Sequence, residues 1–201
     1  MGAKLHPRRP EAQSVVTRNV ADNSSLILLL RGINLGSRRR VAMPELRELL
    51  SEAGFDDVRT YVQSGNVVLS GSGSPSEVAA EAERLIAGRF GFEVDVNART
   101  GDELAEVVAR NPLADVAVNP KRYQVSFLDA EPDPDAVART AELATESERF
   151  VAIGRELYVW HPDGVARSKL SAKLAANGLG VRATARNWTT VTTLLDMARA
   201  S

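Results

Sequence analysis

Apolar and polar positions separate sharply at residue 31 of this 201-residue chain. Residues 26–30 are five aliphatic side chains in a row, whereas residues 31–40 contain two glycines and four arginines. The apolar run does not alternate with polar residues, which predicts a strand that is covered on both faces. The segment after it is predicted to be a cationic loop, and Pro44 favours a helix start just beyond that loop.

The spacing of apolar residues predicts the other elements of the first half. Residues 46–53 repeat apolar side chains at helical spacing, and residues 92–96 alternate them with polar ones. Gln63 to Asn66 reads as a tight turn, and Ser74 to Glu77 is a capping box that opens a second helix. Strands are therefore predicted at 26–33, 58–62, 67–69 and 92–96, with helices from 44 and from 75.

The same order of elements returns in the second half. Strands are predicted at 123–127, 150–153, 157–160 and 181–186, with helices from 134 and from 168. Strand, helix, strand, strand, helix, strand is the order of a ferredoxin-like unit. We therefore predict an α+β fold of two ferredoxin-like (βαββαβ) modules with antiparallel sheets. A helix joins the modules, they dock into one compact body, and a C-terminal helix follows.

The predicted boundaries place a flexible N-terminal tail at 1–25, the first module at 26–99, a linking helix and loop at 100–119, the second module at 120–187 and the C-terminal helix at 188–201.

Each predicted sheet is covered on one face by the helices of its own module. The first strand is apolar on both faces, so its other face needs a cover, and the second module is the nearest candidate. This arrangement predicts a cleft between the sheets or at their rim.

Composition narrows the classes of function. A net charge of −1 argues against a surface that binds nucleic acid throughout, although it permits a local basic patch. Cysteine is absent and histidine occurs twice, so neither a thiolate site nor a multi-histidine metal site is expected, and no cofactor is predicted. No apolar run approaches the length of a membrane span, and residues 1–25 lack the core of a secretory leader. We expect a cytoplasmic protein without membrane partners.

Two groups of loop residues are candidates for an anion site. In a ferredoxin-like unit the first and second strands are parallel, which brings Arg31 and Asn34 beside Ser64 and Asn66. In the second module the end of the hairpin's second strand and the end of the last strand share an edge, which brings together Ser168, Lys169, Arg186 and Asn187. Each edge combines small polar side chains, a cation and a helix start or tight turn, which is the chemistry of anion binding.

Structural roles compete with this interpretation. Ser168 and Asn187 are also well placed as helix N-caps, and Asn66 suits the turn alone. Arg38 to Arg40 are equally consistent with a solvated loop. Arg31 continues a buried strand and therefore needs an acidic residue or a ligand as a partner.

Other chemistry has weaker support. His161 precedes Pro-Asp-Gly, a turn signature, and is expected to be exposed. Trp188 at a helix start is expected in the core, and Tyr61 and Tyr123 give only a weak signal for base stacking. No nucleophile–base pair, Walker loop or dinucleotide fingerprint is present.

Several blocks resemble a known bacterial family. Residues 28–36, 43–46 and 54–68, followed by 111–113, 168–170 and 184–191, are similar to blocks of the domain-of-unknown-function family DUF1697. The similarity extends over about residues 26–199. It implies a two-part ferredoxin-like α+β fold and no particular activity. It also singles out the motif positions Arg31, Asn34, Ser64, Asn66, Ser168, Lys169, Arg186 and Asn187.

The function predicted from the sequence is binding of an anionic ligand, either a nucleotide or a nucleic-acid phosphate. The predicted ligand-binding residues are Arg31, Asn34, Arg38, Arg39, Arg40, Ser64, Asn66, Ser168, Lys169, Arg186 and Asn187. One alternative is an enzyme for a phosphorylated or carboxylated small molecule, with Ser168 or Lys169 near the chemistry. Another is an interaction module without a ligand. The oligomeric state stays open, and the alternatives differ in whether the two edges share one cleft.

Overall fold

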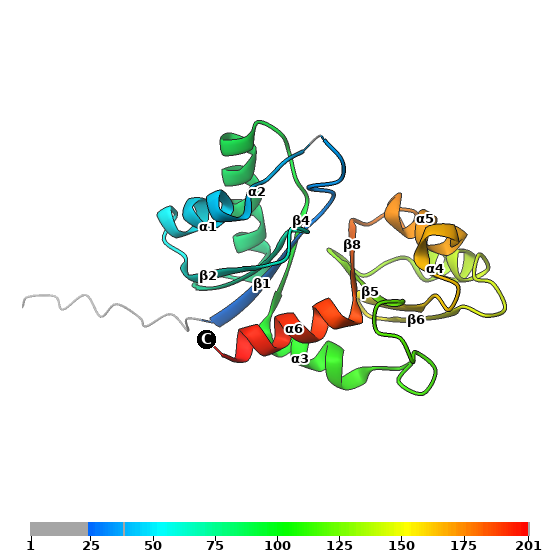
Figure 1. Ribbon diagram of the computed structural model, residues 1–201. Helices are drawn as coiled ribbons and strands as arrows, with labels where there is room; N and C mark the ends of the chain where they lie inside the picture. The colour runs from blue at the N-terminus through cyan, green and yellow to red at the C-terminus, as the bar shows by residue number, and fades with distance from the viewer. Residues whose placement is uncertain (1–23, 38, 201) are drawn as a thin grey trace, which may run out of the picture.

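A computed structural model describes residues 24–37 and 39–200. The first module comprises β1 (Ser24–Leu30), α1 (Met43–Glu52), β2 (Asp56–Tyr61), β3 (Asn66–Gly71), α2 (Pro75–Phe90) and β4 (Val96–Thr100). Its four strands are antiparallel in the order β2-β3-β1-β4. Helices α1 and α2 cover one face of this sheet (Figure 1).

The second module repeats the first. It comprises β5 (Tyr123–Leu128), α4 (Pro134–Ala141), β6 (Arg149–Ile153), β7 (Glu156–Trp160), α5 (Lys169–Ala175) and β8 (Ala183–Asn187), with a 3-10 turn at Val165–Arg167 before α5. The strand order β6-β7-β5-β8 matches that of the first sheet, and all pairs are antiparallel. Helix α3 (Gly101–Arg110) links the modules, and α6 (Trp188–Arg199) ends the fold. The predicted pair of ferredoxin-like modules is confirmed.

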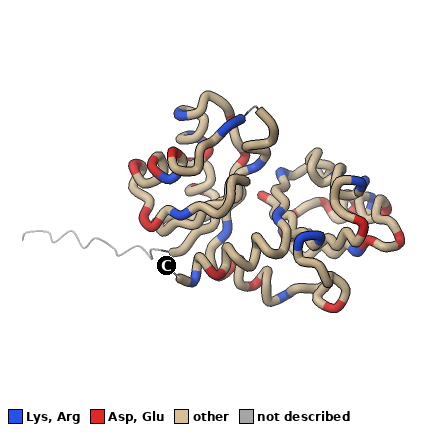
Figure 2. The backbone as a smooth tube through the Cα atoms, in the orientation of Figure 1, with Lys and Arg blue, Asp and Glu red and all other residues tan. Residues whose placement is uncertain are grey.

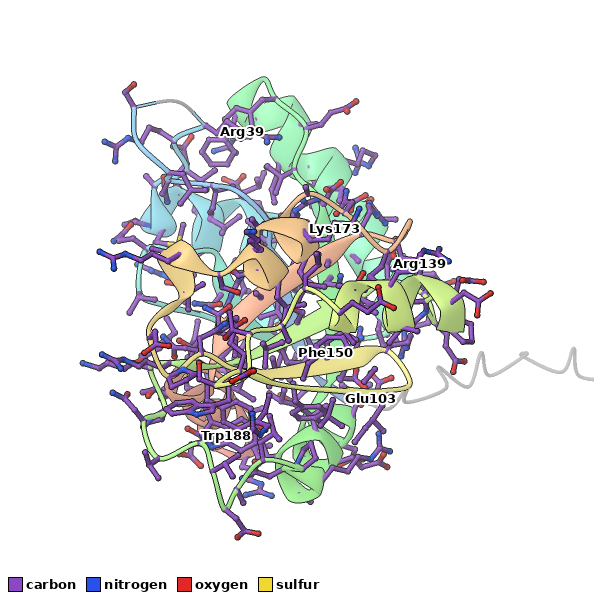
Figure 3. All side chains as sticks on the ribbon, turned by 90° about the vertical axis from the view of Figure 1, so that its right-hand side faces the viewer. Arg39, Glu103, Arg139, Phe150, Lys173 and Trp188 are labelled. Atoms are coloured by element: carbon purple, nitrogen blue, oxygen red, sulfur yellow. The ribbon has the colours of Figure 1, made fainter. Side chains whose placement is uncertain are left out.

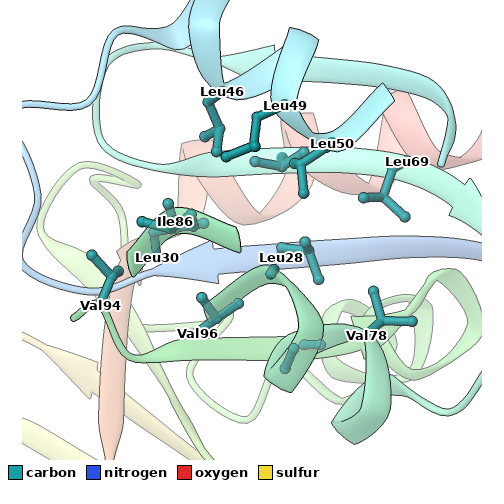
Figure 4. Packing of buried hydrophobic residues seen from close by; sticks show 14 of the residues in the cluster. Leu28, Leu30, Leu46, Leu49, Leu50, Leu69, Val78, Ile86, Val94 and Val96 are labelled. Atoms are coloured by element: carbon teal, nitrogen blue, oxygen red, sulfur yellow. The ribbon is translucent and has the colours of Figure 1, made fainter. Parts of the chain in front are cut away.

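Alternate residues of β1 enter two different cores, which explains its unbroken apolar sequence. Leu26, Leu28 and Leu30 pack with α1 and α2 in one cluster (Figure 4). Ile27 and Leu29 point to the opposite face. All five side chains are at most 1% exposed. The predicted covering of both faces is therefore confirmed.

The cover of the second face consists of helices as well as the second module. Helices α3 and α6 lie side by side at the base of the molecule, between the two sheets (Figure 1). One cluster joins Ile27 and Leu29 of the first sheet, Leu194 of α6, and Val125 and Phe127 of the second sheet. The two modules rise from this shared base, and β8 and α5 of the second face the first across the space between them (Figure 1).

Some boundaries differ from the predicted ones. Strand β4 begins at Val96 rather than Phe92, since Val94 enters the core from a loop without pairing in the sheet. Strand β1 already includes Ser24 and Ser25, and the remainder of the predicted tail, residues 1–23, lies outside the described residues. No helix in the described part of the chain has both the length and the apolar character of a membrane span.

Candidate functional site

A cleft of about 680 Å³ lies between the two modules. Loops and strand ends of both modules line it, so its two walls come from opposite halves of the sequence. The lining residues are Leu30, Arg31, Gly32, Ile33, Leu35, Arg39, Ser64, Asp95, Gln124, Ser126, Val159, His161, Ser171, Leu174, Ala175, Ala183, Thr184, Ala185 and Arg186. Arg31 and Ser64 of the first predicted edge and Arg186 of the second edge thus line one cleft.

Arg186 extends from β8 into the first module. Its Nη2 donates to the carbonyl oxygens of Leu30 at 2.7 Å, Ser64 at 3.2 Å and Gly65 at 3.3 Å. Its Nε donates to Asn66 Oδ1. Every one of these acceptors is neutral, and no acidic side chain among the described residues forms an ion pair with this guanidinium. Burial without a carboxylate lowers the pKa of Arg186 to about 10.

The side chain of Asn66 accepts a hydrogen bond from Arg186 and does not line the cleft. It is fully buried at the start of β3, and its Nδ2 donates to Tyr61 O at 3.1 Å and to Ser64 Oγ at 3.0 Å. This arrangement turns Oδ1 toward Arg186. Ser64 is exposed on the turn and lines the cleft directly. Of this predicted pair, Ser64 is therefore accessible to a ligand, and Asn66 positions the cation.

Arg31 joins the modules at the other side of the cleft. Its Nη1 is 3.2 Å from Asp95 Oδ2, and its Nη2 donates to the carbonyl oxygen of Ala175 in α5. Asp95 also lies 3.4 Å from Arg182 of the second module. The acidic partner that a strand-end arginine requires is therefore Asp95. The side chain of Arg31 remains 24% exposed, so it is open to the cleft.

The loop after β1 is organised by Asn34. Its Nδ2 donates to Val41 O at 2.9 Å and to Gln63 O at 2.8 Å, while its Oδ1 accepts from Val41 N at 2.9 Å. Its backbone is left-handed, with φ of 55°. These bonds use the amide within the loop, so Asn34 shapes the loop, and it does not line the cleft.

The loop cations divide into two kinds. Arg39 lines the cleft, donates to Glu93 O and lies 5.6 Å from the ring centre of Phe92 (Figure 3). Arg40 is exposed and does not line the cleft. Arg38 lies outside the described residues. The sequence alone did not distinguish these neighbours.

The remaining residues of the second edge have structural roles. Ser168 accepts from Ser171 N and caps α5, and Asn187 accepts from Thr190 N and caps α6. Neither lines the cleft. Lys169 is exposed and is also absent from the lining. These positions do not favour an enzyme that uses Ser168 or Lys169 for its chemistry.

The expectation for His161 is wrong. Its side chain is 1% exposed, and its Nδ1 lies 2.6 Å from Glu148 Oε1, itself 6% exposed. Burial alone would raise the pKa of Glu148, but hydrogen bonds from Ser168, the Thr145 backbone and His161 together lower it below its usual value. His161 follows β7, next to the start of β6, and lines the cleft. The turn signature after His161 gave no indication of its partner Glu148, which directly precedes the neighbouring strand β6.

The aromatic residues proposed as weak candidates for base stacking belong to the core. Tyr123 is 1% exposed, and its ring stacks on Trp188 at 4.8 Å between centroids. Trp188 and Tyr61 pack against the same cluster. Figure 3 shows Trp188 among crowded side chains at the base. The core position predicted for Trp188 is confirmed.

Charges of both signs are spread along both modules (Figure 2). Within the cleft the balance differs, because Arg31, Arg39 and Arg186 line it together with a single acidic residue, Asp95. Positive charge is therefore concentrated at the cleft rather than over the surface as a whole.

Comparison with known proteins agrees with this architecture. A family model described as a protein of unknown function, DUF1697, matches residues 24–158. A solved structure of the conserved bacterial protein SP0830 from Streptococcus pneumoniae is similar, with a TM-score of 0.72 and 22% sequence identity. The similarity covers 87% of this chain and 98% of that one. No protein with a curated description matches the sequence.

Proposed function

Because the chain belongs to the DUF1697 family, whose function is unknown, we propose a function from its cleft: the protein binds a small organic anion there. The ligand class is a nucleotide or another phosphorylated or carboxylated small molecule. The observation that carries the proposal is Arg186, a partly buried guanidinium that lines the cleft and whose partners are all neutral. A cation that is partly withdrawn from water without a counter-charge is costly, and an anion that approaches it from the cleft lowers that cost.

The size and lining of the cleft support the same ligand class. A volume of about 680 Å³ falls within the range of small-molecule sites. Arg31 and Arg39 add two guanidinium groups, which match the planar oxygen pairs of phosphates and carboxylates. Hydroxyl groups of Ser64, Ser126 and Thr184 also line the cleft and supply groups that orient a ligand.

A small anion fits better than a nucleic-acid strand. Strand binding usually combines a long basic groove with exposed aromatic rings. Here the surface charges are mixed, and the rings of Tyr123 and Trp188 stack within the core. The cleft lining, by contrast, combines three arginines with one acidic residue in one concave site.

Calorimetric titration with AMP, inorganic pyrophosphate, citrate and a single-stranded oligonucleotide tests the proposal. Arg39→Ala is the informative variant and Arg40→Ala its matched control, because these neighbours share one loop and only Arg39 lines the cleft. We expect at least one small anion to bind. Arg39→Ala should weaken binding by about tenfold, the value of one charge-assisted hydrogen bond of about 1.4 kcal/mol.

Arg40→Ala should leave the affinity within about twofold of the parent protein, as befits an exposed charge away from the ligand. Equal losses in the two variants would contradict a site in the cleft. Binding of the oligonucleotide alone, with a steep dependence on salt, would favour a nucleic-acid phosphate instead. Absence of binding to all four probes would leave the proposal without support and count against it.

A further inference from the structure

His161, which lines the cleft, forms a buried pair with Glu148, which lies behind it outside the lining. His161 directly follows β7, and Glu148 directly precedes the paired strand β6; the Nδ1 of His161 is 2.6 Å from Glu148 Oε1. A carboxylate only accepts hydrogen bonds, so the proton of a neutral imidazole resides on Nδ1. Nε2 is then the ring nitrogen that carries the lone pair, on a residue of the cleft lining.

The floor around His161 is polar although it is deeply buried. Gln124 pairs with Val159, two residues before His161, so these two side chains are diagonal neighbours on one face of the sheet. Ser126 is 2% exposed and lies two residues after Gln124 on the same face, and it also lines the cleft with His161; Thr184, at 3% exposed, pairs with Phe127 and belongs to the opposite face. Polar side chains this deep in a cleft are typical of a site that orients a reacting ligand.

The other charged groups of this corner are placed to support the pair. Arg149 donates to the carbonyl oxygen of Glu148 at 2.8 Å, and Arg122 donates to the carbonyl oxygen of Pro162. Asp163 lies 3.1 Å from Ser147 Oγ. Glu148 is therefore the one acidic side chain, in the described part of the chain, that contacts the imidazole.

We propose that the cleft is a catalytic site in which His161, positioned by Glu148, accepts a proton from a hydroxyl group of the bound anion or from a water molecule. This inference rests on the anion-binding function proposed above. In the step, the O–H bond breaks, its electron pair stays on oxygen, and a new N–H bond forms at Nε2. The imidazolium that results is paired with the Glu148 carboxylate, and Arg31, Arg39 and Arg186 of the same cleft supply the positive charge that favours a negative oxygen. The ligand class is thus a hydroxyl-bearing organic anion, or an anionic ester or anhydride to which the deprotonated water adds while the bond to its alcohol or acid leaving group breaks.

Glu148→Gln provides a sharp test, because Glu148 is anchored at both oxygens. Its Oε2 accepts from the backbone N–H of Thr145 at 3.0 Å. In the glutamine variant that N–H retains the amide oxygen, so the amide NH₂ faces Nδ1 of His161. A donor at Nδ1 shifts the imidazole proton to Nε2 and blocks the lone pair that the step requires. The positioning role of Glu148 therefore predicts a change of tautomer.

The experiment uses the full chain with His6→Ala, which leaves His161 as the single histidine. Diethyl pyrocarbonate acylates an accessible, unprotonated imidazole nitrogen, and mass spectrometry locates the product. Long-range proton–nitrogen NMR reports the tautomer. We expect His161 to be acylated in the folded protein, inorganic pyrophosphate to slow the reaction, and Glu148→Gln to slow it by on the order of tenfold or more with the proton on Nε2.

Acylation of His161 only after addition of denaturant would overturn the inference and make the pair a structural contact. An unchanged rate and tautomer in Glu148→Gln would overturn the role of Glu148. Each of these failures is compatible with calorimetric binding of AMP, pyrophosphate or citrate, and would then affect this inference alone. Absence of anion binding is the separate result that removes the proposed function.

Discussion

Two arginines at the junction of the modules, Arg99 and Arg186, differ in their burial and in their partners. Arg99 in β4 is 1% exposed and pairs with Glu156 of β7 at 3.0 Å, while its other nitrogens donate to Asn97 and Leu128. Burial lowers the pKa of Arg99, and Glu156 opposes that change. Arg186 has neutral acceptors alone. Arg99 is therefore a structural link with its own counter-charge, whereas Arg186 has no carboxylate partner among the described residues.

Arg99→Met should be strongly destabilising, because it leaves Glu156 buried without its cation. Loss of one partner of a buried ion pair costs about 3–5 kcal/mol of unfolding free energy. Combining it with Glu156→Leu removes the unpaired charge and should recover much of the loss. Denaturant unfolding measures the stability of both variants. Arg84→Met, which breaks an exposed ion pair with Glu81, is the control and should leave the stability nearly unchanged. Equal losses for Arg99→Met and the double variant would contradict this account.

The pKa of Arg186 predicts a pH dependence for anion binding. Because burial lowers this pKa to about 10, the guanidinium is charged at neutral pH and loses its proton as the pH rises through that value. Affinity should therefore be constant near neutral pH and then fall by up to about tenfold per pH unit above pH 10. Calorimetry over this range measures the change. Lys173→Ala, which removes a basic side chain of α5 outside the cleft lining, is the control and should show the same profile.

At the scale of the elements, the turn between β2 and β3 packs closely against the end of β1 and against Arg186 of the second module. Gly65 has φ of 74°, and a Cβ there would lie 2.6 Å from Leu30 Cβ and 2.9 Å from Ile33 Cδ1. The carbonyl of Gly65 accepts from Leu30 N at 2.8 Å and also from Arg186. The glycine thus allows the turn to contact both β1 and the second module.

Gly65→Ala should cost about 2–5 kcal/mol, from left-handed strain of about 1–2 kcal/mol and overpacking of about 1–3 kcal/mol. Gly91→Ala is a matched control. Gly91 also has φ of 74°, but a Cβ there meets nothing within 4 Å, so only the strain of about 1–2 kcal/mol remains. Denaturant midpoints compare the two. A loss in Gly91→Ala as large as that in Gly65→Ala would mean that the contact with Leu30 contributes nothing.

The elements themselves were predictable from the sequence, because their signals are local. The capping boxes at Ser74 and Thr100 start helices at the predicted places, and periodic apolar residues predict the strands. The environment of His161 was predicted wrongly because it depends on a contact that is not local in the sequence. Its turn signature is local, whereas Glu148 lies thirteen positions earlier and meets it through strand pairing. A strand register of this kind is set by tertiary packing rather than by neighbours in the sequence.

At the scale of the whole molecule, the cleft exists because of how the modules dock. Arg186 bonds to Leu30, which is 156 positions away, and Arg31 bonds to Ala175, which is 144 positions away. No local pattern encodes such contacts, so the sequence predicted a cleft without placing its walls. The docking depends on α6, since its apolar face contacts β1 and β3 of one sheet and β5 and β8 of the other. The two modules should therefore lose their structure together.

Leu194→Ala tests this coupling at the centre of α6. Leu194 is 1% exposed in the cluster that joins both sheets, so its truncation should cost about 2–5 kcal/mol. If α6 couples the sheets, denaturant unfolding remains a single transition, and hydrogen exchange accelerates by the same factor for amides of β1 and β5. Asp196→Ala, at an exposed position of the same helix, should change stability by less than about 0.5 kcal/mol. Faster hydrogen exchange in the amides of one sheet alone would show that the modules unfold independently. The packing of α6 would then not be what holds the two walls of the cleft together.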